Sequence, residues 1–111
     1  MRPVSILKVV LIVALAVTLA VSVAAAATRN VGVKHKGNKW SFTPSTLTIK
    51  KGSTVKWKWS GKTFHNVTSS GFHSKTSAKL TFSHKFTKAG TYKVECTIHQ
   101  SLGQKMTIKV K

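Results

Sequence analysis

The chain contains a single cysteine, Cys96, and a histidine, His99, follows it in the segment CTIHQSLGQKM. One cysteine cannot form an intramolecular disulfide, so the thiol is a buried structural group, an intermolecular bridge, a nucleophile or a metal ligand. A nucleophile is the least favoured of these, because its base needs a third group to orient it. The only acidic residue, Glu95, alternates to the other face of the strand.

A metal site needs a further ligand besides the Cys-x-x-His pair. His65, in the segment GKTFHNV, comes after a strand and a glycine turn and would complete a His-Cys-His set. A soft thiolate with two imidazoles suits copper in a trigonal site, or zinc with a fourth ligand. Among the other histidines, His84 lies in an apolar stripe and is expected in the core or at its rim. His35 and His73 lie among lysines in loops and are expected to be solvated.

The elements that must position these side chains are strands. Apolar and polar residues alternate with period two in several short segments, and glycine turns separate them. These segments are residues 55–59, 80–86, 92–96 and 106–110. No segment after residue 27 has a convincing helical period. The sequence therefore predicts an all-β fold, a small antiparallel β-sandwich with Cys96 facing inward at a strand end. The tryptophans, Trp40, Trp57 and Trp59, are expected in its core.

Residues 1–27 have the pattern of a secretory signal peptide. Arg2 and Lys8 supply a short positive segment, residues 9–23 are almost wholly apolar, and residues 24–27 are alanines. An uncleaved N-terminal anchor is the alternative. We therefore expect an exported protein, in the periplasm, the cell envelope or the extracellular space, with one domain over residues 28–111. A domain this short buries a modest core and commonly needs a further stabilising cross-link, which a bound metal could supply.

The charge balance is extreme, with 19 Lys and Arg against one acidic residue and a formal net charge of +18. Such a surface attracts anions. Anionic lipid, envelope polymers, nucleic acid and acidic proteins are all candidate partners, and charge alone does not choose among them. Of these, nucleic acid is the least expected. The basic residues are spread along the chain, so a disordered basic tail is not expected. We expect a monomer.

Some segments of the chain resemble the cupredoxins, the type 1 blue-copper proteins related to plastocyanin and amicyanin. They are FTPSTLTIKKGSTVKWKW, then HNV, then FTKAGTYKVECTIH, and they occur in the order typical of that family. The resemblance implies a Greek-key β-sandwich that binds one copper ion. It implies His65, Cys96 and His99 as the copper ligands. It also implies that Asn66 ties the two ligand loops together, with Thr97 as its partner.

The axial position of such a site departs from the family pattern. Amicyanin-like spacing from Cys96 reaches Leu102, which cannot coordinate and would leave a three-coordinate copper with a raised reduction potential. Plastocyanin-like loops are longer, and their spacing reaches Gln104, whose amide would coordinate and lower the potential. Leu102 is the favoured reading. Met106 belongs to an alternating strand and is expected in the core.

The resemblance implies a carrier of single electrons between redox partners rather than an enzyme. A basic surface would steer it toward an acidic partner protein. Two other functions fit the residues. One is a basic secreted module that binds anionic envelope polymers, in which Cys96 and the histidines are incidental. The other is a copper storage or delivery protein that uses the same ligands without electron transfer.

Overall fold

The computed structural model describes residues 26–111, so nearly all of the predicted signal peptide lies outside the described residues. The described residues form strands and one short 3-10 helix, η1 (Gln100–Leu102). The strands are β1 (Thr28–Lys36), β2 (Lys39–Thr43), β3 (Thr46–Ile49), β4 (Thr54–His65), β5 (Thr68–Ser69), β6 (Phe72–His73), β7 (Ser77–Lys85), β8 (Gly90–Glu95) and β9 (Lys105–Val110). Over the same residues, no helix has the length and apolar character needed to cross a membrane.

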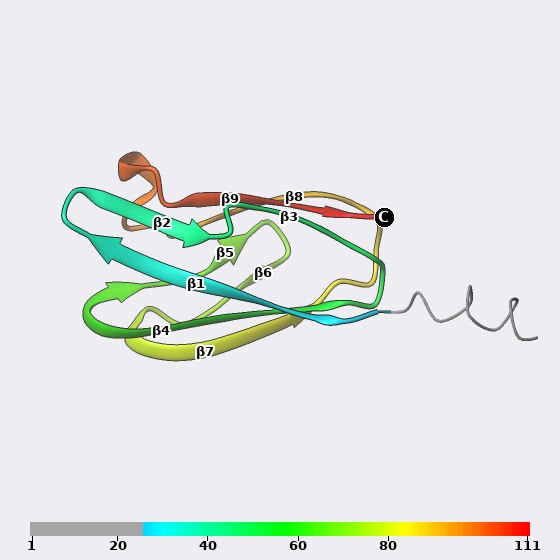
Figure 1. The fold of residues 1–111 in the computed structure, drawn as a ribbon, viewed down its shortest axis with the longest axis horizontal. Coiled ribbons are helices and arrows are strands. Elements are labelled where there is room, and N and C mark those ends of the chain that lie inside the picture. The colour runs from blue at the N-terminus through cyan, green and yellow to red at the C-terminus, as the bar shows by residue number, and fades with distance from the viewer. Residues whose placement is uncertain (1–25) are drawn as a thin grey trace, which may run out of the picture.

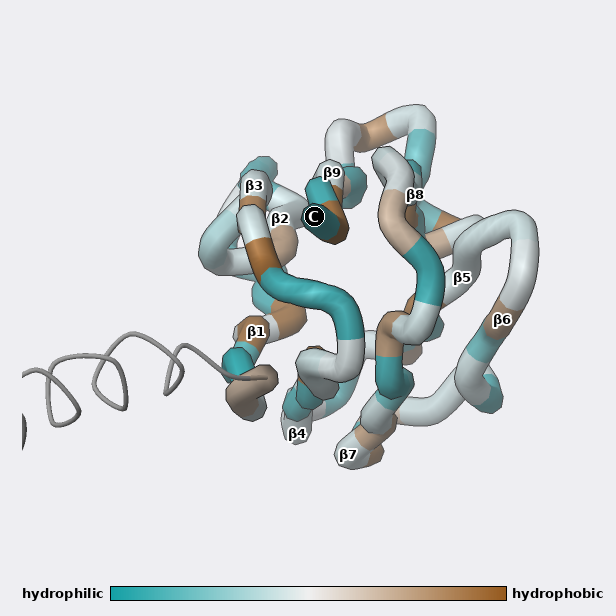
Figure 2. Tube along the Cα trace, turned by 90° about the vertical axis from the view of Figure 1, so that its right-hand side faces the viewer, coloured by the Kyte–Doolittle hydropathy of each residue, from teal (hydrophilic) through white to brown (hydrophobic). Residues whose placement is uncertain are grey.

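The strands form two sheets that face each other. The four-stranded sheet has the order β2-β1-β4-β7, and the five-stranded sheet has the order β3-β9-β8-β5-β6. Figure 2 looks along the sandwich and shows the two sheets on opposite sides of its interior. The predicted all-β sandwich is confirmed. Its sheets are mixed rather than purely antiparallel, because β1 runs parallel to β4 and β3 runs parallel to β9. Alternation in the sequence reports which side chains face inward, but not the direction of the neighbouring strand.

Alternating residues of β4 form one side of the core. Val55, Trp57 and Trp59 are buried, whereas Lys56 and Lys58 between them are exposed. The opposite sheet supplies a matching apolar face from β8 and β9, as expected for a two-layer sandwich. Its buried residues include Val94, Met106, Ile108 and Val110. The expected core positions of Trp57, Trp59 and Met106 are therefore confirmed.

Three chain segments meet at one end of the sandwich. β4 ends there at His65, β8 ends there just before Cys96, and η1 follows. Figure 1 shows this end opposite the C-terminus, beside the turn between β1 and β2. The loop between β8 and β9 is closed by its own backbone, since Cys96 N donates to Gln104 O at 3.1 Å and Gln104 N donates to His99 O at 3.2 Å. The fold thus delivers the sequence-predicted ligands to one place on closed, hydrogen-bonded segments.

Replacing Ile108 with alanine tests this packing. Ile108 is 0% exposed and lies in β9 opposite Tyr92 of β8 and Leu47 of β3. Ile108→Ala should lower the free energy of unfolding by about 2–5 kcal/mol, because it leaves a cavity in the core. The neighbouring Lys109→Ala, on the exposed face, should change it by less than about 0.5 kcal/mol. Denaturant unfolding of the metal-free protein measures both, and equal small effects would contradict the position of Ile108.

Candidate metal centre

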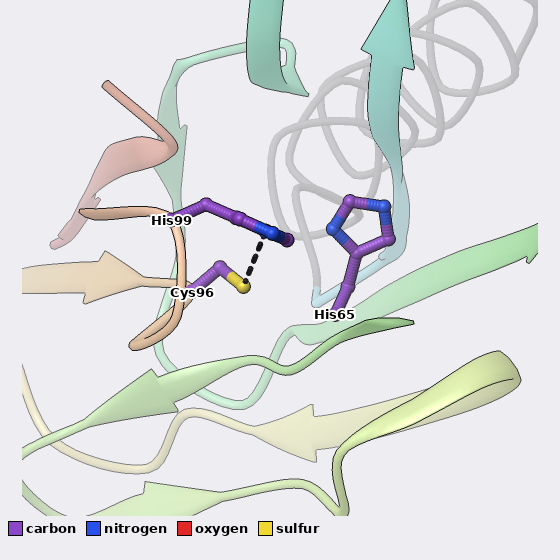
Figure 3. Close-up of side chains that lie close together, drawn as sticks. All are labelled: His65, Cys96 and His99. Atoms are coloured by element: carbon purple, nitrogen blue, oxygen red, sulfur yellow. Dashed lines mark hydrogen bonds between the residues drawn. The ribbon is translucent and has the colours of Figure 1, made fainter. Parts of the chain in front are cut away.

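His65, Cys96 and His99 converge on one point (Figure 3). His65 is the last residue of β4, Cys96 directly follows β8, and His99 precedes η1. One ligand atom from each side chain lies within 4.8 Å of the other two. Sγ of Cys96 is 3.4 Å from Nδ1 of His99. His65 and Cys96 are buried and His99 is half-buried, so the cluster lies just beneath the surface.

Hydrogen bonds join the loop after β4 to the loop after β8. The backbone N–H of Asn66 donates to Sγ of Cys96 at 3.4 Å. The Asn66 side chain donates from Nδ2 to Thr97 Oγ1 at 2.8 Å, and its Oδ1 accepts from the Thr97 backbone N–H at 3.0 Å. Asn66 and Thr97 are thus the pair that the family resemblance implied.

Gln104 is the polar side chain packed against the cluster. Its Oε1 accepts from Nδ1 of His65 at 2.9 Å and from Nδ1 of His99 at 3.1 Å. Its Nε2 donates to the backbone carbonyls of Lys34 at 3.1 Å and Ser41 at 3.2 Å. Because an amide nitrogen only donates, these two carbonyls fix the orientation of the amide and turn its oxygen toward the imidazoles.

Leu102 and Gln104, the two candidates for the axial position, differ in burial. The Leu102 side chain is 54% exposed on η1, whereas Gln104 is 0% exposed. Gly103 separates the two residues and has a φ of 91°, a left-handed conformation that glycine adopts at little cost. The chain therefore turns sharply after η1, and residue counting in the loop did not capture this turn.

The protonation of His65 suits a metal ligand. Burial lowers the pKa of His65, and the nearby His99 and His35 lower it further, whereas the hydrogen bond with Gln104 acts in the opposite direction. A lowered pKa keeps the imidazole neutral at neutral pH. The neutral form is the one that can donate a lone pair to a metal.

Trp40 covers the imidazole of His99. The two ring centroids are 3.9 Å apart with an interplanar angle of 30°, and His35 stacks on the other side of Trp40 at 3.5 Å and 10°. The His35 ring is held by contacts to Thr63 Oγ1 at 3.2 Å and to Gly37 O at 2.9 Å. Trp40 is therefore a half-buried part of the site rather than core, and the exposed His35 is ordered rather than freely solvated.

Sequence reasoning missed this role of Trp40 because alternation shows only that Trp40 is on the inward face of β2. It cannot show that the inward face at this end of the strand meets a ligand loop instead of the apolar interior.

Three exposed large apolar residues lie close to the ligands in the sequence. Phe64 precedes His65 and is 56% exposed, Ile98 precedes His99 and is 50% exposed, and Leu102 lies on η1. Large apolar residues that gather on the exposed surface around a site are typical of contact areas for other molecules. The half-buried Trp40 adds to this end of the molecule.

The other candidate histidines lie outside the cluster. His73 is exposed, as expected, but it lies in strand β6 rather than in a loop, and His35 likewise lies in strand β1. His84 in β7 is partly buried and stacks on Phe72, with ring centroids 4.0 Å apart. Burial lowers the pKa of His84, as expected for a histidine at the rim of the core.

The donor atoms of the cluster fit copper. A thiolate and two imidazole nitrogens form the set that suits a trigonal copper site, and an amide oxygen is among its known weak axial donors. The side chains that orient these donors are themselves hydrogen-bonded. Among residues 26–111, no buried side-chain nitrogen or oxygen lacks a hydrogen-bond partner. The arrangement is therefore held in place by the protein.

Comparisons with known proteins agree with this site. Residues 29–111 match the family model of the copper binding proteins, plastocyanin/azurin family. The purple cupredoxin of Nitrosopumilus maritimus superimposes with a TM-score of 0.65 at 22% identity, over 75% of this chain and 99% of that one. Pseudoazurin from Hyphomicrobium denitrificans gives 0.64 at 23% identity, over 75% of this chain and 74% of that one. Plastocyanin from Dryopteris crassirhizoma gives 0.62 at 24% identity, over 74% and 99%.

These structural matches share the fold described above, and the family match includes His65, Cys96, His99 and Gln104. The cofactor of this family is one copper ion, in keeping with the donor atoms of the cluster. Since the family match extends over most of the chain, the protein belongs to the plastocyanin/azurin family of copper-binding proteins.

Proposed function

We propose that this protein is exported and carries single electrons through a type 1 copper site formed by His65, Cys96 and His99. The observation that supports this most is the convergence of one thiol and two imidazoles, with ligand atoms within 4.8 Å of one another. A bound copper ion supplies the one-electron chemistry by alternating between Cu(I) and Cu(II). The signal-peptide pattern of residues 1–27 supports export.

The protein contributes rigidity. His65 is held at a strand end, and Cys96 is held by the backbone bond to Gln104 O and by the N–H of Asn66. These ligands sit on closed segments, so they keep one arrangement whether the site is oxidised or reduced. Fast electron transfer needs this, since ligand motion adds to the barrier of each transfer. A storage protein has no such requirement.

We propose Gln104 as the axial donor in place of Leu102. Its Oε1 lies 2.9 Å and 3.1 Å from the Nδ1 atoms of His65 and His99, and the carbonyls of Lys34 and Ser41 hold the amide in that orientation. An amide oxygen is a harder donor than a thioether, so it favours Cu(II) and lowers the reduction potential.

The partner would dock at the end that carries the ligands. His99 is half-buried beneath Trp40, and the exposed Phe64, Ile98 and Leu102 offer an apolar contact area there. With copper bound, the half-buried His99 and the Trp40 ring over it would give the electron its exit at this end of the molecule. The net charge of the whole chain is +18, so an acidic redox protein fits as the partner.

Replacing the thiol tests the proposed function. The copper-loaded protein should absorb strongly in the visible through charge transfer from thiolate to Cu(II), and Cys96→Ser should abolish that band. Absorption and paramagnetic resonance spectra measure this, with Thr107→Ser in β9 as a control that keeps the band. Reversible voltammetry separates a carrier from a copper storage protein. A colourless wild-type protein would refute the type 1 site and favour a basic binding module.

The axial donor has its own test. Gln104→Met should raise the reduction potential by more than roughly 59 mV, which corresponds to a tenfold change in the relative stability of the two copper states. Leu102→Met, on the exposed turn, should leave the potential unchanged. Protein-film voltammetry measures both variants, and circular dichroism verifies that Gln104→Met keeps the fold. If instead Leu102→Met shifts the potential and Gln104→Met does not, Gln104 is not the axial donor.

Electrostatic steering can be measured with small redox probes. Oxidation of the reduced protein by an anionic cobalt(III) complex should slow by at least about tenfold from low to high salt, because salt screens the attraction. Oxidation by a cationic cobalt(III) complex should become faster, because salt screens the repulsion. Stopped-flow absorption records both rates. Rates that do not depend on ionic strength with either probe would remove the argument for an acidic partner.

A further inference from the structure

The outer face of the four-stranded sheet carries a concentrated array of lysines. Strand register places one alternating set of residues from β1, β2, β4 and β7 on the side away from the core. The lysines of this set are Lys34, Lys36, Lys39, Lys56, Lys58, Lys79 and Lys85, and all are exposed. We refer to these residues as the lysine face.

No acidic group neutralises the lysine face. The only acidic side chain of the protein, Glu95, lies in β8 of the other sheet. In register, Lys56 lies between Asn30 of β1 and Ser83 of β7. Lys36 is directly opposite Lys39, a like-charge pair that destabilises a sheet. The face thus keeps its positive charge at a cost to the fold.

A glycine makes room for part of this array. A Cβ atom at Gly32 would lie 2.9 Å from Cε of Lys34, so the Lys34 side chain extends across the backbone at Gly32. On its other side, Gly32 is the register partner of Lys58. Gly32 therefore leaves room for the Lys34 side chain in the middle of the sheet.

The outer face of the second sheet is less basic. Its lysines in β8 and β9 are Lys93, Lys105 and Lys109, and Glu95 pairs in register with Lys105. Lys93 is the register partner of Thr107 and donates to its hydroxyl at 3.3 Å. The positive charge of the molecule is therefore unequal between the two faces. Solubility requires charge on the surface but does not require its concentration on one face.

The remaining outward residues in the register-paired part of the four-stranded sheet restrict the class of ligand. The exposed Phe64 of β4 lies beyond this paired part, next to the ligand His65. The paired residues are small or uncharged polar ones, namely Thr28, Asn30, Gly32, Ser41, Thr43, Thr54, Ser60, Thr81 and Ser83. Because no aromatic ring is among them, the face offers no platform for stacking nucleic-acid bases. Because no large apolar side chain is among them, it has nothing to insert into hydrocarbon. What remains is a two-dimensional array of ammonium groups.

We propose that the lysine face binds the surface of a bilayer of anionic phospholipids. An array of ammonium groups spread over four strands matches a planar layer of phosphate headgroups better than it matches a single polymer chain. Strands lying along the membrane leave the ligand end of the sandwich open to the side, so docking of a redox partner and membrane binding use different surfaces. This inference goes beyond the proposed electron transfer and does not depend on copper.

The test uses two variants of equal net charge. One is Lys56→Gln/Lys58→Gln/Lys85→Gln on the lysine face, and the control is Lys93→Gln/Lys105→Gln/Lys109→Gln on the opposite face. Binding to phosphatidylcholine vesicles that contain phosphatidylglycerol is measured by co-sedimentation at low and high salt. Each lysine near an anionic surface strengthens binding roughly fivefold, so the first variant should lose about a hundredfold in affinity and the control only a few-fold. Circular dichroism verifies both folds.

The expected result includes equal binding by metal-free and copper-loaded protein, which separates this inference from the copper function. Equal losses in the two variants would overturn it, because binding would then follow net charge alone. Failure of the wild-type protein to bind the anionic vesicles would also overturn it. If the protein binds polyphosphate or single-stranded DNA but not the vesicles, the face serves a linear polyanion instead.

Discussion

The hydrogen bonds of Asn66 to the loop after β8 are the constraint on which the site depends. Asn66 follows His65, and its backbone N–H reaches Sγ of Cys96 while its side chain exchanges two hydrogen bonds with Thr97. These bonds join two sheets at their common end, because β4 belongs to one sheet and β8 to the other. They therefore fix the end of β4, which carries His65, against the loop that carries Cys96.

The hairpin of β1 and β2 forms a second support for the same site. Backbone carbonyls of Lys34 and Ser41 hold the amide of Gln104, and Trp40 from the same hairpin lies over the ring of His99. A segment far away in the sequence thus orients one side chain of the ligand loop and shields another. This arrangement explains how so small a domain can keep a thiol, an imidazole and an amide buried beside the half-buried ring of His99. Each of them has a partner, so the cost of removing it from water is offset.

The metal-ligand cluster and the lysine face lie on different parts of the molecule. The ligands and the exposed apolar residues Phe64, Ile98 and Leu102 gather at the end of the sandwich, whereas the lysine face runs along the side of the four-stranded sheet. In a β-sandwich these surfaces are independent, because loops build the ends and alternate strand residues build the faces. The two surfaces meet at the turn between β1 and β2 (Figure 1), where Lys36 and Lys39 of the lysine face lie beside the ligand end.

The sequence by itself determined the alternation of apolar and polar residues that predicts the sandwich and the buried positions of β4 and β9. It also contains the motifs that indicate the family and identify His65, Cys96 and His99 as ligands. These features are local, since a strand exposes every second side chain whatever its neighbours are. Only the tertiary structure decided the parallel pairing of β1 with β4, the approach of Gln104 rather than Leu102 to the imidazoles, and the cover that Trp40 provides. Each of these depends on how distant segments meet. For the ligand loop the decisive feature is the left-handed backbone of Gly103, which turns Leu102 outward and Gln104 inward in a way that spacing along the chain does not encode.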